Sequence, residues 1–335
     1  MIGTTNPLNA VKHLVFFGEC MREHRANGTV HFGGDTFNTA WYCNLLLNQF
    51  GVTDIVISYA TSVGDDNTSS EFLTLLSQNG IKQDYVTRHS TKTMGEYWVK
   101  NLSNGERQFS FNRSNSAAKD YFENDEPLSF ALNVKHIDAI YLSGISLAIL
   151  PSKSRARLFE CLNSFKQQGG LIFFDNNYRA SLWPASEAKP AFKAMMALAD
   201  IAFLTNDDEY AVFGKSTVDD IINCHHGSNS LTQSFAELVI RQGAAPCVIK
   251  FPNSDALTNV PAAAVAPSCI VDTCAAGDAF AGAYLAARLC NNHDLANSHK
   301  KAANLAHQVA ATVIQQYGAL LPAHAFLNCI NKELS

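Results

Sequence analysis

A three-layer α/β fold, with helices on both faces of a mostly parallel central sheet, is predicted by three features of this sequence. Short apolar runs typical of buried strands alternate with longer amphipathic segments from residue 11 to residue 316. One such unit, strand 137–142, helix 154–168 and strand 171–174, has the lengths of a right-handed parallel crossover. Two alternating segments within residues 93–112 fit no such unit and therefore indicate a second, small sheet.

The position of each element follows from its local pattern. Continuous apolar runs predict buried strands, alternation on both sides of residues 101–105 predicts a hairpin, and Asn79-Gly80 ends the second helix. The expected strands lie at residues 11–17, 54–59, 93–99, 107–112, 137–142, 171–174, 201–204, 245–250 and 269–271. The expected helices lie at residues 36–50, 69–78, 154–168, 279–288 and 300–316.

Composition limits the class of protein. The chain has 335 residues, of which 47% are hydrophobic, so it can bury one large core or a core with a small appendage. No apolar run approaches the ~20 residues of a membrane span, and the polar first ten residues argue against a signal peptide. The net charge of −5 is dispersed, unlike the clustered basic footprint of a nucleic-acid-binding protein. The nine scattered cysteines, without a Cys-x-x-Cys pair, indicate reduced thiols in a cytoplasmic protein.

The first long helix begins with residues that suit a small ligand. Gly33 and Gly34 precede it and would let a ligand lie against the backbone, while Asn38 would project from its first turn. Either Asp35 or Thr36 is expected to cap this helix. The alternative is a plain helix start that binds nothing.

A second polar cluster follows the strand at residues 171–174. It reads Asp175-Asn176-Asn177-Tyr178-Arg179 and stands at the carboxyl end of that strand, where open parallel sheets bind their ligands. It is therefore a candidate site, with a capped loop as the alternative.

The stretch at residues 271–284 predicts a turn of small residues that opens a buried helix. Such a turn leaves backbone N–H groups free, and together with the helix dipole they form an anion site. Asp278 stands in the same turn, where an acid is favourable if it takes a proton from a group that attacks the anion. Phosphoryl transfer to an alcohol needs this arrangement. An ordinary strand-to-helix turn is the alternative.

This turn resembles the C-terminal signature Asp-Thr-x-Gly-Ala-Gly-Asp of the ribokinase-like (PfkB) sugar kinases, since residues 272–278 read Asp-Thr-Cys-Ala-Ala-Gly-Asp. Ala275 replaces the usual glycine, and this version looks like that of the 2-keto-3-deoxygluconate kinase branch. Gly33, Gly34 and Asn38 match the spacing of the N-terminal signature Gly-Gly-x-x-x-Asn. With further similar runs between these signatures, the resemblance covers essentially the whole chain.

The resemblance implies a ribokinase-like fold in which a small β lid covers the sugar. We expect the lid at residues 20–32 and 92–113, and the large α/β domain at residues 1–19, 33–91 and 114–335. Because the lid often forms the dimer contact in this family, a homo-oligomer is also implied.

The resemblance also implies roles for individual residues. Asp278 would be the catalytic base, and the N–H groups of Ala275, Ala276 and Gly277 would stabilise the charge on the transferred group. The other implied roles are sugar binding by Gly33, Gly34, Asp35, Asn38, Tyr97, Phe111, Arg113, Asn177 and Arg179, nucleotide binding by Lys250 and Asn304, and orientation of Mg²⁺ through water by Asn206 and Glu209.

The implied reaction is ATP-dependent phosphorylation of 2-keto-3-deoxy-D-gluconate to its 6-phosphate, in sugar-acid catabolism of the Entner–Doudoroff type, with Mg²⁺ as cofactor. Arg113 and Arg179 suit the substrate carboxylate, since arginine binds carboxylates bidentately, with service to the transferred phosphoryl group as the alternative for either. Two alternatives stay open: a kinase of the same fold for a neutral sugar such as fructose or ribose, and a sugar-acid-binding regulator without turnover. The short segment after Lys250 departs from the family, which leaves open how the nucleotide base is covered. Nucleotide preference and dependence on a monovalent cation also stay open.

Overall fold

The computed structural model describes residues 7–25, 28–101, 107–123, 126–225, 237–251, 254–290, 298–323 and 326. Its central sheet has nine strands in the order β13-β12-β11-β10-β9-β8-β1-β4-β5. These strands are β1 (His13–Phe17), β4 (Val56–Gly64), β5 (Lys82–His89), β8 (Ala139–Ser143), β9 (Leu171–Asp175), β10 (Ile201–Thr205), β11 (Glu237–Gln242), β12 (Ala245–Lys250) and β13 (Leu257–Val260). The pairs from β5 to β11 are parallel, and β12 and β13 are antiparallel to their neighbours, so the predicted mostly parallel sheet is confirmed.

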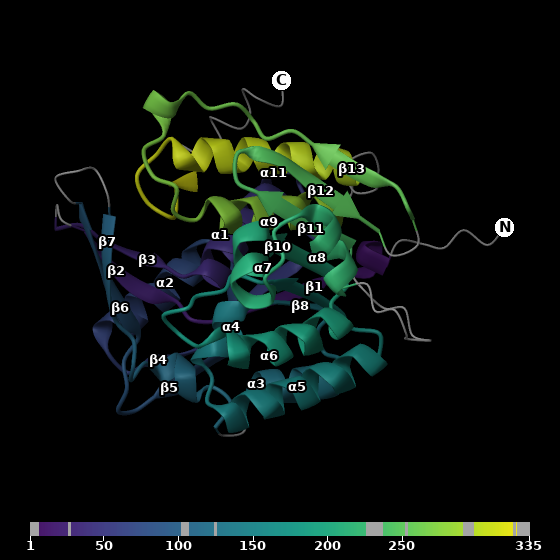
Figure 1. Cartoon of the computed structure of the whole chain (residues 1–335). Helices are drawn as coiled ribbons and strands as arrows, with labels where there is room; N and C mark the ends of the chain where they lie inside the picture. Colours follow the sequence, from purple (N-terminus) through teal and green to yellow (C-terminus); the bar gives the residue numbers. More distant parts are fainter. Residues whose placement is uncertain are drawn as a thin grey trace.

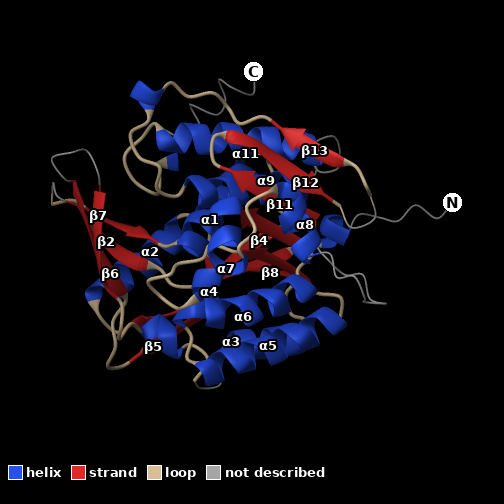
Figure 2. Cartoon of the chain, in the orientation of Figure 1, coloured by secondary structure: helices blue, strands red, loops and turns tan. Residues whose placement is uncertain are grey.

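Helices cover both faces of this sheet (Figure 1, Figure 2). Because side chains alternate along a strand, Leu14 and Phe16 of β1 pack into one apolar core, and Val15 and Phe17 pack into the other. The first core is covered by α1 (Asp35–Gln49), α2 (Asn67–Gln78), α9 (Ala276–Leu289) and α11 (His299–Ile314). The second is covered by α3 (Pro127–Asn133), α4 (Gly144–Ile149), α5 (Ser152–Gln167), α6 (Ala185–Leu198), α7 (Asn206–Phe213) and α8 (Val218–His225). The expected three-layer architecture is therefore present.

A second sheet lies beside the body of the molecule (Figure 1). We call it the lid sheet; its strands, in spatial order, are β3 (Val30–Gly33), β2 (Met21–Arg25), β6 (Gly95–Asn101) and β7 (Arg107–Asn112). The hairpin turn expected at residues 101–105 falls almost entirely outside the described residues.

Several local expectations were wrong. Residues 269–271 form no strand: Pro267–Cys269 is a 3-10 turn and Ile270 is 43% exposed, so an apolar run alone did not imply burial. Strands β5 and β11 were not expected, since their sequences are short or largely polar and only pairing with neighbours identifies them. The residue before α1 is Gly34 in extended conformation, and Asp35 is already helical.

None of the helices in the described part of the chain combines the length and the apolar character needed to cross a membrane.

Candidate active site

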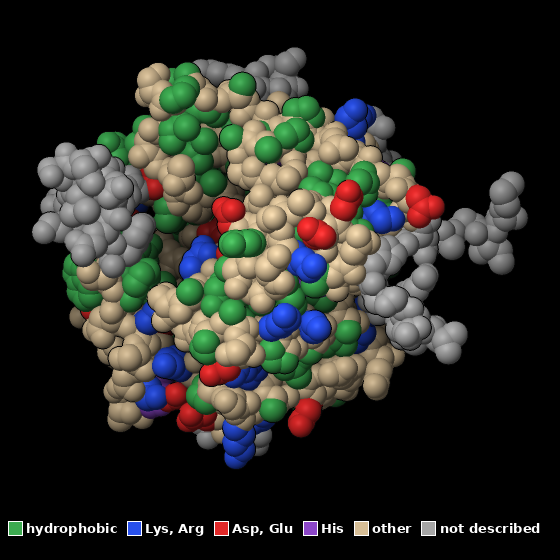
Figure 3. Space-filling model, viewed as in Figure 1, with side chains coloured by type: hydrophobic (Ala, Val, Ile, Leu, Met, Phe, Trp, Pro, Cys, Tyr) green, Lys and Arg blue, Asp and Glu red, His purple; other side chains and the backbone are tan. Residues whose placement is uncertain are grey.

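A cavity of about 1090 Å³ lies where the carboxyl ends of β9, β10 and β11, the start of α9 and the lid sheet meet. Figure 3 shows a hollow beside the lid sheet, with acidic and basic side chains at its edge. The predicted residues that line it are Gly34, Asp35, Asn38, Tyr97, Phe111, Arg113, Asn177, Arg179, Ala275, Ala276, Gly277 and Asp278. Residues from opposite ends of the chain thus meet in one cavity.

The turn before α9 has the backbone shape of an anion-binding helix start. Ala275 has φ 60° and ψ 9°, the left-handed conformation that glycine adopts most easily. It turns the chain so that the first amides of α9 lie at the cavity wall, where Ala276 and Gly277 line it. The family's glycine at this position is explained by this conformation, and Ala275 occupies it at a steric cost.

Asp278 has the environment of a general base. Asn38 Nδ2 donates a hydrogen bond to Asp278 Oδ2 at 2.8 Å and so fixes the carboxylate. Burial, with the nearby charge of Asp35, raises the pKa of Asp278 from 3.8 to about 7. A carboxylate with a pKa near neutrality can both accept a proton and hold it through a reaction step.

A second carboxylate lies beside this base. Asn177 Nδ2 donates to Asp35 Oδ2 at 2.8 Å, and burial raises the pKa of Asp35. Asn177 has φ 24°, a conformation that asparagine tolerates better than most residues. These contacts join α1 to the polar cluster after β9, and the two carboxylates share one cavity.

Arg241, at the end of β11, is a cavity residue that the sequence analysis missed. Its guanidinium makes a bidentate pair with Asp175, with N–O distances of 2.9 and 2.6 Å, and donates to Thr205 Oγ1 at 3.1 Å and to the Gly277 carbonyl at 3.1 Å. The sequence could have indicated this residue, because Arg241 follows an apolar run and shortly precedes Gly243, as expected at the end of a buried strand. Because Arg241 lies beside the anion turn, it is a candidate for binding the phosphate groups.

The lid side of the cavity is organised by a buried hydrogen bond and a buried ion pair. The Tyr97 hydroxyl donates to Glu23 Oε2 at 2.6 Å, and Arg113 pairs with the buried carboxylate of Glu19. Phe111 is 53% exposed, and its ring centroid lies 5.8 Å from that of Tyr97. Tyr97 and Arg113 are therefore already held by protein partners.

The two glycines before α1 are required by the packing of the protein itself, because a side chain at either position would meet neighbouring protein atoms. A Cβ atom on Gly33 would lie 2.5 Å from the Tyr97 hydroxyl oxygen, and one on Gly34 would lie 2.2 Å from the Glu19 carbonyl oxygen. Gly34 lines the cavity. Gly33 is buried and is not among the described residues that line the cavity.

Neither of the predicted nucleotide-binding residues, Lys250 and Asn304, is among the described residues that line this cavity. Strand β12 is antiparallel to β11 and pairs Lys250 with Leu238, so Lys250 stands at the edge opposite the cavity, where its ammonium contacts the Ser254 carbonyl. The placement of Lys250 at the nucleotide-phosphate edge is therefore wrong. Asn304 is exposed on α11, and His307 and Ala310 are the residues of this helix among the described cavity lining.

Of the residues predicted to orient Mg²⁺, neither the half-buried Asn206 nor Glu209 is among the described residues that line the cavity. Glu209 is 1% exposed, with one oxygen accepting from Asn176 Nδ2 at 3.2 Å and the other 2.7 Å from His225 Nε2. Among the described residues, the carboxylates at the start of α7 that line the cavity are Asp207 and Asp208. Burial raises the pKa of Asp208 to about 6. The described residues contain no cluster of three or more His, Cys, Asp or Glu side chains that could hold a metal by themselves.

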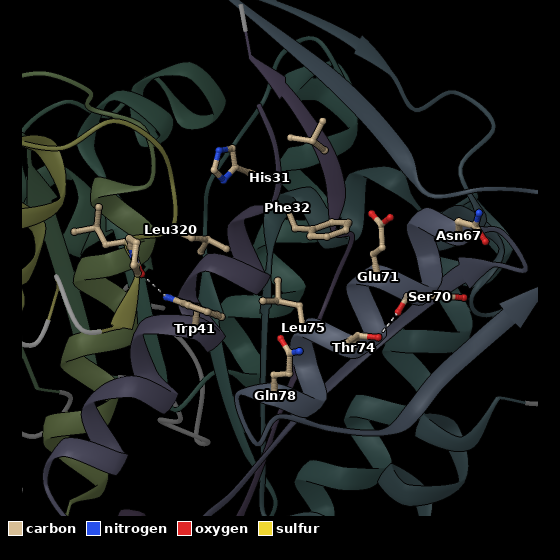
Figure 4. Close-up of a pocket in the computed structure, with 13 residues that line it drawn as sticks. His31, Phe32, Trp41, Asn67, Ser70, Glu71, Thr74, Leu75, Gln78 and Leu320 are labelled. Atoms are coloured by element: carbon tan, nitrogen blue, oxygen red, sulfur yellow. Dashed lines mark hydrogen bonds between the residues drawn. The ribbon is translucent and has the colours of Figure 1, made fainter. Parts of the chain in front are cut away.

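A second cavity, of about 700 Å³, lies between β3, α2 and residues 320–322 (Figure 4). Its wall combines Trp41, Phe32 and Leu75 with polar side chains of α2, among them Glu71. It contains none of the predicted site residues among those described, so the candidate chemistry belongs to the larger cavity.

The chain is similar to known proteins along its whole length. The family model described as pfkB family carbohydrate kinase matches residues 2–325. The 2-dehydro-3-deoxygluconokinase of Dickeya dadantii is 38% identical over 318 residues, which cover 94% of this chain and 98% of that protein. The 2-dehydro-3-deoxygluconokinase of Escherichia coli K12 is 35% identical over the same shares of both chains.

Solved structures share the fold at lower identity. The 2-dehydro-3-deoxygluconokinase of Thermotoga maritima superposes with a TM-score of 0.73 at 19% identity, covering 96% of this chain and 99% of that one. The fructokinase of Xylella fastidiosa with bound ATP has a TM-score of 0.73 at 20% identity, covering 97% and 99%.

Proposed function

This chain belongs to the pfkB family of carbohydrate kinases, and on that premise we propose that it phosphorylates 2-keto-3-deoxy-D-gluconate with ATP to give the 6-phosphate. The relatives that are 35–38% identical carry the name of this activity, since 2-dehydro- and 2-keto-3-deoxygluconate are one compound. The structural observation that carries the proposal is Asp278, a carboxylate with a pKa of about 7 at the wall of a cavity that also holds an anion turn.

In the proposed reaction, Asp278 accepts the proton of the terminal hydroxyl of the sugar acid while Asn38 holds its carboxylate. The hydroxyl oxygen forms a bond to the γ-phosphorus, and the bond from that phosphorus to the bridging oxygen breaks and leaves ADP. The amides of Ala275, Ala276 and Gly277 stabilise the equatorial oxygens of the transferred group. Arg241, fixed by Asp175, adds positive charge on the same side.

ATP would bind as its Mg²⁺ complex, and the ion neutralises charge on the nucleotide phosphates. Mg²⁺ prefers oxygen ligands and keeps several waters, so it needs few protein groups. Asp207 and Asp208 fit this chemistry because their carboxylates line the cavity, whereas both oxygens of Glu209 are occupied by protein donors.

Arg179 is the better candidate for the substrate carboxylate. Its side chain is 52% exposed and lines the cavity. Its guanidinium lies 3.9 Å from the Asp208 carboxylate, which is a weak ion pair at that distance. Arg113 is neutralised by the buried Glu19 and has less positive charge to offer. We assign Arg179 to the carboxylate and Arg113 to the support of the lid.

A kinase screen tests the function. Purified protein is assayed for ADP release with ATP and 2-keto-3-deoxy-D-gluconate, fructose or ribose, with K⁺ and with Na⁺ to test the monovalent cation. We expect the highest kcat/KM with the sugar acid. A higher kcat/KM with fructose or ribose would establish the neutral-sugar alternative, and binding of the sugar acid without turnover would establish the regulator.

Assembly and location are part of the same proposal. Trp98 on β6 is 41% exposed and stacks on His24, which gives the lid sheet an apolar surface suited to a second copy. The eight described cysteines are free thiols, which fits a reducing cytoplasm. Light scattering of the wild type and of Trp98→Lys tests the homo-oligomer: a dimer is expected for the former and a monomer for the latter.

A further inference from the structure

Glu209 is a buried carboxylate that the proposed chemistry does not use directly. It lies in the first turn of α7 and is enclosed by protein donors, with Asn176 Nδ2 at 3.2 Å from one oxygen and His225 Nε2 at 2.7 Å from the other. His225 is the last residue of α8, and its side chain is 2% exposed, with the ring edge against Phe213. A carboxylate removed from water is tolerated only with such partners, so His225 and Asn176 are both required to keep it there.

Asn176 connects Glu209 to residues that line the cavity. Its Oδ1 accepts from the backbone N–H of Thr205 at 3.2 Å and of Asn177 at 2.8 Å, and its Nδ2 lies 3.4 Å from the Thr205 carbonyl. One side chain thus ties the carboxyl end of β9 to that of β10. Glu209 and the two backbone N–H groups together fix the orientation of this amide, because only the orientation observed turns Nδ2 toward the carboxylate and Oδ1 toward the N–H groups.

The residues that Asn176 holds, Asn177 and Thr205, both line the cavity. Asn177 lines it in a left-handed conformation and donates to Asp35, while Thr205 accepts a hydrogen bond from Arg241. A conformation of this kind persists only where neighbouring contacts determine it. The path from His225 to Asp35 therefore consists of hydrogen bonds, joined by the backbone of residues 176 and 177.

We propose that His225 is a positioning residue for phosphoryl transfer: by holding Glu209, and through it Asn176, it sets Asn177 against Asp35. The inference rests on the proposed kinase function. His225 would touch neither the sugar nor the nucleotide, and it would act only through Glu209.

The test compares three substitutions in the full-length protein. His225→Leu removes the donor and keeps the packing against Phe213, whereas His225→Gln keeps an N–H donor near the position of Nε2. Ile222→Ala is the matched control, because it weakens the apolar packing of the same helix α8. KM and kcat are measured with whichever sugar or sugar acid the wild type phosphorylates best, together with the thermal midpoint of each variant.

We expect His225→Leu to raise KM for the sugar about tenfold, the usual scale for loss of a supporting contact, with KM for ATP changed less than about threefold. His225→Gln should return KM for the sugar to within about threefold of the wild type. Ile222→Ala should lower the thermal midpoint and leave KM unchanged. An unchanged sugar KM in His225→Leu, or an equal loss in His225→Gln, would overturn the proposal.

Two further measurements distinguish failure of the positioning role from failure of the variant to fold and from a wrong substrate. If His225→Leu does not fold, Asn176→Ser carries the same test, because it cuts the path beyond Glu209. A crystal structure of the variant should show the Asn177–Asp35 hydrogen bond lost. If that bond is retained, the positioning role is refuted, whereas failure of the wild type to phosphorylate the sugar acid refutes only the proposed substrate.

Discussion

Replacing Asp35 with asparagine should move the acid limb of the pH–rate profile to lower pH. Asp278 must be ionised to accept a proton, and its pKa of about 7 means that roughly one tenth of it is ionised at pH 6. The wild-type kcat/KM should therefore fall about tenfold between a plateau above pH 8 and pH 6. A carboxylate with the ordinary value of 3.8 would be almost fully ionised over that range.

The structure sets the size and the limits of the change. Burial is the largest cause of the raised pKa of Asp278, and the charge of Asp35 is the second. Asp35→Asn removes only the second cause, so the midpoint should lie below 7 and remain above 3.8. Because Asp35 also lines the cavity, Asp35→Asn should raise KM for the sugar. This rise should be the same at each pH, so it does not move the midpoint of the acid limb.

The stability of the protein should show the same linkage. The folded-state pKa of Asp278 is raised, so its contribution to stability is fully present below the unfolded value of 3.8 and is lost as the pH rises through about 7. Asp278→Asn, which cannot ionise, should therefore raise the free energy of unfolding more at pH 8 than at pH 5.

The assay is steady-state kinetics from pH 5 to pH 9, with denaturant unfolding at pH 5 and pH 8. Asp278→Asn should lose at least ~10²-fold in turnover and have no acid limb. Asp65→Asn is the control, since Asp65 is exposed and lies 3.6 Å from Arg88, remote from this chemistry. A flat wild-type profile from pH 5 to pH 8, or the same midpoint in Asp35→Asn as in the wild type, would refute the reasoning.

Three other changes test separate parts of the site. Ala275→Gly should stabilise the fold by about 0.5–1 kcal/mol, because relief of the left-handed strain exceeds the added entropy of the unfolded chain; chemical denaturation measures this, and a loss of stability contradicts it. Arg241→Leu should lower turnover at least ~10-fold and destabilise the fold by about 3–5 kcal/mol, since it leaves Asp175 buried without its partner; unchanged turnover would remove Arg241 from the phosphate side. Arg179→Ala should raise KM for the sugar acid about tenfold or more, and more than Arg113→Ala does; the reverse order in steady-state kinetics would reassign the carboxylate.

The features that the sequence determined by itself are those set by neighbours along the chain. Apolar runs and helical periodicity depend on a few adjacent residues, so β1, β8, β9 and β10 were predictable, as were the helices α1, α2, α5, α9 and α11. The turn at residues 272–278 was predictable for the same reason, because small residues before a helix start expose its amides whatever surrounds them. The left-handed conformation of Ala275 was not predicted, since alanine allows fewer backbone angles than the usual glycine, and only the structure shows it.

Strand order and direction, which only the tertiary structure decided, account for the wrong or missing site residues. Lys250 ends an apolar strand just as Arg241 does, and local pattern does not distinguish them. Strand β11 runs parallel to β10 and β12 runs antiparallel to β11, so the end of β11 reaches the cavity and the end of β12 points to the opposite edge.

Long-range contacts decided the chemistry in the same way. Asn38 and Asp278 are 240 residues apart in sequence, and Asp35 raises the pKa of the base only because α1 and α9 pack together. The partners of Glu209 come from the segment after β9 and from α8, and the sequence alone did not indicate that they surround this carboxylate. Burial and charge at a site depend on distances in space, and the sequence contains these only through the packing of the whole chain.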